Sequence, residues 1–146
     1  MIAAKPIEIL LVEDNPGDVR LTQEGLKEGK VTNNLHVATD GVEAMEFLRK
    51  EGGFSNSPRP NLILLDLNLP KKNGKEVLEE IKSDPDLRRI PVVMLTTSRD
   101  EQDILKSYEL HCNCYVTKPV GFDQFMEVVT SINEFWLTVV ELPNEK

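Results

Sequence analysis

The sequence predicts an α/β fold, a doubly wound (βα)5 domain built around a five-stranded parallel sheet, and three observations support this prediction. Five short apolar runs alternate with five segments whose apolar residues recur at helical spacing. The apolar runs are rich in valine, isoleucine and leucine, which is typical of strands buried on both faces. Polar residues follow these runs at their carboxyl ends, where open α/β sheets bind ligands.

The order of the elements follows from this alternation. The expected strands span residues 7–12, 35–39, 61–66, 90–96 and 113–117. The expected helices span residues 16–30, 41–50, 74–83, 99–110 and 121–140. Asp40 and Ser98 precede two of these helices and are of the residue types that cap helix N-termini. Residues 51–60, rich in Gly, Ser, Asn and Pro, are expected to form a solvated loop, with a partner contact as the alternative.

Length, charge and cysteine content exclude several classes of protein. A chain of 146 residues fits one domain, expected to span residues 1–146 with a core at about 6–140. A net charge of −8 repels nucleic acids and anionic membrane surfaces. The first apolar run ends at Glu13 and is too short for a signal peptide or a membrane span. Cys112 and Cys114 are one residue apart and cannot staple the fold, so we expect a cytoplasmic protein.

Charged and hydroxyl side chains end four of the five expected strands. Glu13 and Asp14 follow the first, Asp66 ends the third, Thr96 ends the fourth and Lys118 follows the fifth. If the strand order is 2-1-3-4-5, the three carboxylates converge at the topological switch point. At about 4 Å, each pair of carboxylates would repel by on the order of 4 kcal/mol. Lys118 offsets only part of this charge, so the pocket favours Mg²⁺, whereas the calcium loop motif is absent.

A magnesium ion beside a carboxylate, a hydroxyl and a lysine indicates phosphoryl transfer. Asp66 is the best candidate nucleophile, because it has no adjacent acid. Asp14 is expected to bind the metal directly, Glu13 through water, and Asn68 through its backbone carbonyl, while Thr96 can donate to a phosphoryl oxygen. Each residue alone also fits a structural role, as a cap, a solvated turn or a strand residue. Their joint occurrence at successive strand ends favours the functional interpretation.

Four motifs at these strand ends carry a family resemblance. They are ILLVEDN (residues 9–15), DLNLPKKNG (66–74), PVVMLTT (91–97) and YVTKP (115–119). With them, about residues 6 to 140 resemble the response-regulator receiver family, which includes CheY. The resemblance implies a flavodoxin-like fold with the sheet order 2-1-3-4-5. It also implies a phospho-acceptor signalling protein that catalyses only its own phosphorylation and dephosphorylation.

The same resemblance implies a role for each site residue. It makes Asp66 the phospho-acceptor, Lys118 the phosphate contact, Thr96 the switch hydroxyl and Tyr115 the switch aromatic, with a cis peptide at Lys118–Pro119. The Mg²⁺ site would be formed by Glu13, Asp14, Asp66 and the backbone carbonyl of Asn68. Two positions depart from the family pattern, since methionine is frequent at the position of Leu69 and alanine at that of Thr97. The larger Thr97 side chain is expected to slow access to the phosphoryl group and therefore dephosphorylation.

Three further stretches narrow the resemblance. EDNPGDVRL (residues 13–21), LHCNCY (110–115) and FWLTVVELP (135–143) are similar to the cyanobacterial phytochrome response regulators. This similarity implies a phytochrome-like, light-sensing histidine kinase as the phosphodonor. It also implies two-component signalling by a receiver that has no output domain.

The last expected helix carries an unusually wide apolar surface. On a helical wheel its apolar arc covers about 200°, against about 100° for an ordinary surface helix. The part of this arc that is not needed for packing on the sheet consists of Val128, Ile132, Phe135 and Val139. An exposed apolar stripe marks an interface, so we expect a homodimer or a kinase contact there. The alternative is that residues 141–146 cover the stripe.

Three other functions fit these residues less well. A phosphatase of the haloacid-dehalogenase type would have a second Asp two residues after the nucleophile, where this chain has Asn68. A flavodoxin-like electron carrier would bind a flavin phosphate where Glu13 and Asp14 repel it. A pseudo-receiver acting only as a docking module would lack the acceptor or the lysine, and both Asp66 and Lys118 are present.

Overall fold

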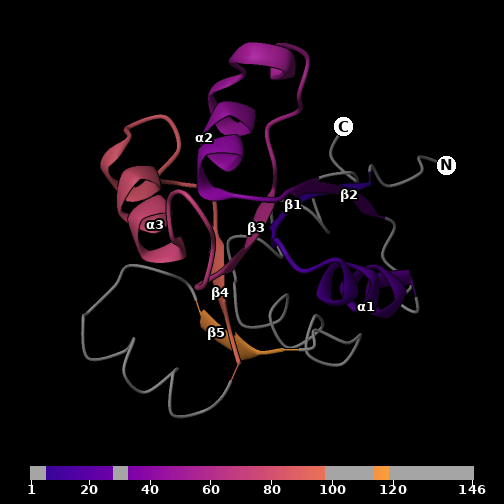
Figure 1. Ribbon diagram of the computed structural model, residues 1–146. Coiled ribbons are helices and arrows are strands. Elements are labelled where there is room, and N and C mark those ends of the chain that lie inside the picture. The colour runs from indigo at the N-terminus through magenta and orange to yellow at the C-terminus, as the bar shows by residue number, and fades with distance from the viewer. Residues whose placement is uncertain (1–5, 28–32, 98–113, 119–146) are drawn as a thin grey trace, which may run out of the picture.

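Five parallel strands form a single sheet at the centre of the protein, seen in a computed structural model that describes residues 6–27, 33–97 and 114–118 (Figure 1). The sheet order is β2-β1-β3-β4-β5, which confirms the predicted doubly wound α/β fold. The strands are β1 (Ile7–Val12), β2 (Asn33–Ala38), β3 (Leu62–Asp66), β4 (Val92–Thr96) and β5 (Cys114–Thr117). The described helices are α1 (Pro16–Lys27), α2 (Gly41–Arg49), the short 3-10 helix η1 (Gly52–Phe54) and α3 (Gly74–Ser83).

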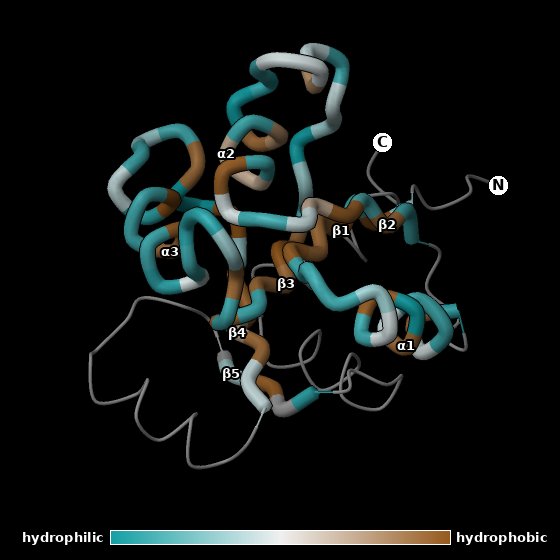
Figure 2. Tube along the Cα trace, in the orientation of Figure 1, coloured by the Kyte–Doolittle hydropathy of each residue, from teal (hydrophilic) through white to brown (hydrophobic). Residues whose placement is uncertain are grey.

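Two apolar layers cover the two faces of the sheet. On one face, alternate strand residues such as Leu10 and Ile63 pack against α2 and α3. On the other face, neighbours such as Leu11 and Leu64 pack with Leu26 of α1. All residues of β3 and β4 are buried, as expected for central strands covered on both sides. Figure 2 shows the same arrangement, with mainly hydrophobic strands between α1 on one side and α2 and α3 on the other, and with both hydrophilic and hydrophobic residues along the helices.

Several element boundaries differ from the sequence prediction. β2 begins at Asn33 instead of residue 35, and the Asn34 side chain there donates to Oε2 of Glu8 on β1 (3.0 Å). β4 begins one residue after Pro91, which has no N–H to give to a strand ladder, although its carbonyl still accepts from Ile63. Pairing with β1 therefore extends the start of β2, which local propensity alone does not decide, whereas the start of β4 follows from the proline.

The stretch 51–60, predicted as a solvated loop, has some structure of its own. It includes η1, and Phe54 contacts Phe47 of α2 edge-on with ring centroids 5.6 Å apart. Most of its other residues are exposed, in agreement with the prediction.

Some predicted features lie outside the described residues. These are the helices at 99–110 and 121–140, the Ser98 cap, Pro119 and the docking stripe of Val128, Ile132, Phe135 and Val139. Among the helices that the structure does describe, none has the length and apolar character needed to cross a membrane.

Caps and a close backbone contact hold the loops that surround the carboxyl ends of the strands. Asp40 accepts a hydrogen bond from the Glu43 N–H (2.7 Å), which confirms the predicted cap of α2. At the start of α3, the Gly74 N–H donates to the Leu67 carbonyl (2.9 Å). A Cβ at Gly74 would collide with the main-chain carbonyl of Asp66. The loop after β3 can therefore fold back tightly against Asp66 only because residue 74 is glycine.

Candidate functional site

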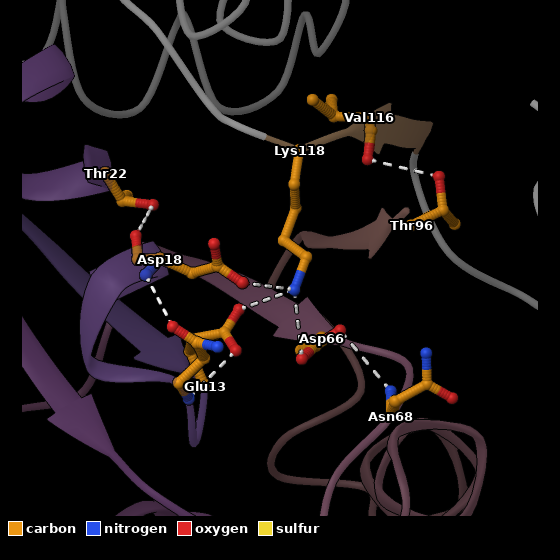
Figure 3. Close-up of polar contacts among 9 residues, drawn as sticks. Glu13, Asp18, Thr22, Asp66, Asn68, Thr96, Val116 and Lys118 are labelled. Carbon is orange, nitrogen blue, oxygen red and sulfur yellow. Dashed lines mark hydrogen bonds and ion pairs between the residues drawn. The ribbon is translucent and has the colours of Figure 1, made fainter. Parts of the chain in front are cut away.

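The side chains predicted from the strand ends meet at one edge of the sheet (Figure 3). Glu13 directly follows β1, and its N–H continues the strand ladder by donating to the Ala38 carbonyl (2.9 Å). Asp66 is the last residue of β3. Lys118 directly follows β5, and its N–H donates to the Thr96 carbonyl (2.8 Å). Backbone pairing therefore positions all three side chains at the same edge.

Three carboxylates form the acidic trio of Glu13, Asp14 and Asp66. Each offers an oxygen atom, and these oxygens lie within 4.8 Å of one another. Glu13 and Asp66 are 1% and 2% exposed, whereas Asp14 is exposed and opens the trio to solvent. Ligand oxygens of an octahedral Mg²⁺ lie about 3 Å apart when adjacent and about 4.2 Å apart when opposite. The trio therefore fits a hard divalent cation after small movements or with a bridging water.

Lys118 reaches across the sheet and contacts three carboxylates (Figure 3). Its Nζ lies 3.1 Å from Oε1 of Glu13, 2.8 Å from Oδ2 of Asp18 and 3.4 Å from Oδ2 of Asp66. The contact with Asp66 agrees with the predicted site, but Asp18 was not predicted as part of it. Asp18 lies in the first turn of α1, where an acid is commonly explained by the helix dipole. The sequence therefore contained no distinct signal for its contact with Lys118.

Burial dominates the electrostatics of the site. Burial, followed by the charge of Asp66, raises the pKa of Glu13 to about 7. Burial also raises the pKa of Asp66, against the opposing effect of the Lys118 charge. Burial alone would lower the pKa of Lys118, but the hydrogen bond to Asp18 and the charges of Asp66 and Glu13 outweigh it and raise that pKa. The lysine remains cationic, and its single charge leaves the acidic trio only partly neutralised.

The unfavourable burial of the Glu13 carboxylate beside Asp66 predicts a pH-dependent effect of Glu13→Gln on the free energy of unfolding. The pKa of Glu13 rises from 4.5 to about 7 on folding, so its contribution is most favourable below pH 4.5 and is lost as the pH rises through 7. We therefore expect Glu13→Gln to raise the unfolding free energy of the metal-free protein at pH 8 by on the order of 2 kcal/mol. The gain should shrink towards pH 4.5. Urea denaturation in EDTA across this range measures it.

Glu24→Gln is the matched control for this prediction. Glu24 lies on α1 with a largely exposed side chain and pairs only weakly with Arg20, so its replacement should show no comparable pH dependence. A stabilisation by Glu13→Gln that is the same at pH 5 and pH 8 would contradict the electrostatic explanation.

The remaining predicted residues lie around this centre. The Asn68 N–H donates to Oδ1 of Asp66 (3.3 Å), so the backbone of Asn68 is next to the Asp66 carboxylate. Thr96 is fully buried, and its Oγ1 donates to the Val116 carbonyl (3.4 Å) on β5 instead of pointing at Asp66 (Figure 3). Tyr115 is half-buried and packs with the core cluster beneath α2 and α3.

Comparison with known proteins agrees with this geometry. Residues 9–130 of the chain match the response regulator receiver domain. The chain belongs to this receiver family. The matched residues include the whole acidic trio and Lys118, so the site described here lies within the receiver domain.

The relatives of this receiver include phytochrome response regulators. The response regulator Rcp1 of Synechocystis sp. is 56% identical over 138 residues, which cover 94% of each chain. The solved Mn²⁺-bound form of Rcp1 is 57% identical with a TM-score of 0.73, and the match covers 92% of this chain and 97% of that one. The phosphorylated cyanobacterial phytochrome response regulator RcpA is 55% identical with a TM-score of 0.73, covering 92% and 96%. The predicted resemblance to the cyanobacterial phytochrome response regulators is confirmed.

Proposed function

We propose that this receiver accepts a phosphoryl group on Asp66 from a histidine kinase in a reaction that requires Mg²⁺. The observation that carries the proposal is the placement of Asp66, a buried carboxylate between two other acids and the ammonium of Lys118. Such a pocket holds a divalent cation and a lysine beside one nucleophile, which is the arrangement that phosphoryl transfer needs. The chemistry proposed is confined to the protein's own phosphorylation and dephosphorylation.

In the proposed reaction, an oxygen of Asp66 attacks the phosphorus of a phosphohistidine. An oxygen–phosphorus bond forms, the nitrogen–phosphorus bond breaks, and the imidazole leaves and takes a proton from solvent. Lys118 then donates to a phosphoryl oxygen, and Asp14, Glu13, Asp66 and the Asn68 carbonyl would hold the metal. Bound Mg²⁺ would neutralise charge on the phosphoryl oxygens.

We propose a phytochrome-type light sensor as the kinase, because the relatives Rcp1 and RcpA support this choice. Mixing the protein with labelled, autophosphorylated candidate kinases tests it. The expected result is fastest transfer of the label from the phytochrome kinase, with none to an Asp66→Ala control. Slower transfer from the phytochrome kinase than from an unrelated kinase would refute the choice of partner but not the acceptor role.

The proposal includes a conformational switch at Thr96 and Tyr115. Phosphoryl oxygens would attract the Thr96 hydroxyl, whose bond to the Val116 carbonyl is long (3.4 Å). The movement of Thr96 would leave space for Tyr115 on the neighbouring strand. We expect Thr96→Ala to be phosphorylated while showing a reduced change in its amide NMR spectrum. A full wild-type response in that variant would contradict the coupling.

We propose that residues 1–146 form a single receiver domain that acts in the cytoplasm, signals by docking to proteins and does not bind nucleic acid directly. Homodimerisation through Val128, Ile132, Phe135 and Val139 is part of this proposal. Analytical ultracentrifugation of Phe135→Asp, with and without phosphorylation, tests it, and a wild-type protein that is monomeric in both states would refute it.

A further inference from the structure

The Lys118 ammonium is fully engaged before any phosphoryl group is present. An ammonium has three N–H donors, and Lys118 lies within bonding distance of three carboxylates. The shortest contact is to Asp18 (2.8 Å) and the longest is to Asp66 (3.4 Å). The Lys118 side chain is 13% exposed and that of Asp18 is 30% exposed, so solvent screens this contact less than an ordinary surface ion pair. The tightest partner of the lysine therefore lies outside the acidic trio.

The carboxylate of Asp18 is not needed for the cap of its own helix. At the start of α3, the Glu76 side chain closes a capping box by accepting from the Asn73 N–H (2.9 Å). At the start of α1, the equivalent N–H belongs to Asn15 and donates to Glu13 (3.2 Å). Asp18 contributes to its cap through its main-chain N–H, which donates to Oδ1 of Asn15 (3.0 Å). Its carboxylate is thus left to bind Lys118.

We infer that Asp18 is a positioning residue that holds the Lys118 ammonium beside Asp66 in readiness for the phosphoryl group. The inference rests on the proposed acceptor role of Asp66. A lysine side chain has many rotamers, and ordering it during the reaction would carry an entropic cost. With Asp18 and Glu13 each accepting one N–H, the third N–H is left for the Asp66 side, where Nζ lies 3.4 Å from Oδ2 and where the phosphoryl oxygens would lie. Asp18 also connects α1 to β5 through this contact.

Charge and positioning predict opposite effects when Asp18 is replaced by asparagine. If Asp18 acted only through its negative charge, its removal would ease the approach of an anionic phosphodonor and speed phosphorylation. If Asp18 positions Lys118, its removal frees the ammonium and slows phosphorylation. The substitution keeps the main-chain N–H that Asn15 caps, so the helix start is preserved.

The test uses Asp18→Asn with acetyl phosphate and Mg²⁺. We expect the phosphorylation rate to fall about tenfold, which corresponds to about 1.4 kcal/mol. Mg²⁺ affinity, measured by calorimetry, should stay close to the wild-type value, because Asp18 is not in the acidic trio. In the metal-free, unphosphorylated protein, the Lys118 ammonium protons should exchange faster with water in the ¹⁵N NMR spectrum. Assignment of this signal rests on its loss in Lys118→Arg.

Two companion variants complete the experiment. Glu24→Gln removes an acid from the same helix, at an exposed site paired with Arg20, and should leave both the rate and the ammonium signal unchanged. Asp18→Glu keeps the negative charge and should recover much of both. An unchanged or faster rate in Asp18→Asn, or an unaltered ammonium signal, overturns the inference. Normal labelling of Asp66→Ala would instead refute the acceptor role, while the ammonium signal would still report on Asp18.

Discussion

Replacing Asp66 with alanine is expected to abolish phosphorylation by acetyl phosphate and Mg²⁺, lowering the rate by on the order of a thousandfold or more. Asp66 is a buried carboxylate that neighbours every other part of the site: the other two acids, the Lys118 ammonium and the Asn68 backbone. Alanine removes the attacking oxygen, and neither Glu13 nor Asp14 ends a strand at this central position. Intact-protein mass spectrometry should show one acid-stable, base-labile phosphoryl group in the wild type and none in the variant.

The control for this experiment is Asp86→Ala. Asp86 lies between α3 and β4 with an 87% exposed side chain, far in sequence from the acidic trio, and its removal should leave labelling at the wild-type level. Asn is a poorer replacement for Asp66, because it can deamidate and restore the acceptor. Labelling of Asp66→Ala at the normal rate would show that another side chain is the acceptor.

Replacing Asp14 with alanine is expected to weaken Mg²⁺ binding by on the order of tenfold to a hundredfold. Asp14 is the exposed member of the acidic trio, whereas Glu13 and Asp66 are buried, so we expect Asp14 to bind the ion from the solvent side. Its loss should lower the phosphorylation rate at a limiting Mg²⁺ concentration in parallel. Isothermal titration calorimetry measures the affinity, and a phosphorylation assay over a range of Mg²⁺ concentrations measures the rate.

Urea denaturation of Asp14→Ala separates an effect on metal binding from an effect on folding. The metal-free variant should be at least as stable as the wild type in urea, because one of three mutually repelling carboxylates is gone. Asp86→Ala again serves as the control for a lost acid outside the trio. Unchanged Mg²⁺ affinity in a folded Asp14→Ala protein would exclude Asp14 as a metal-binding residue.

Sequence alone determined the fold class and most of the acidic site. The apolar runs that form β1, β3 and β4 are local patterns, and parallel strands that end at one edge necessarily bring their following residues together. For this reason the acidic trio and its contact with Lys118 could be expected before the structure was known. Capping at Asp40 is equally local and was predicted correctly.

Only the tertiary structure decided which charges meet in the site and how strongly they are buried. Asp18 and Lys118 are 100 residues apart, and only the packing of α1 beside the sheet brings their charges to 2.8 Å. The raised pKa of Glu13 depends on how much solvent the whole fold excludes and on the nearby charge of Asp66. The start of β2 at Asn33 depends on its pairing with β1. Burial, summed charge and strand pairing are properties of residues distant in the chain, so no local pattern in the sequence encodes them.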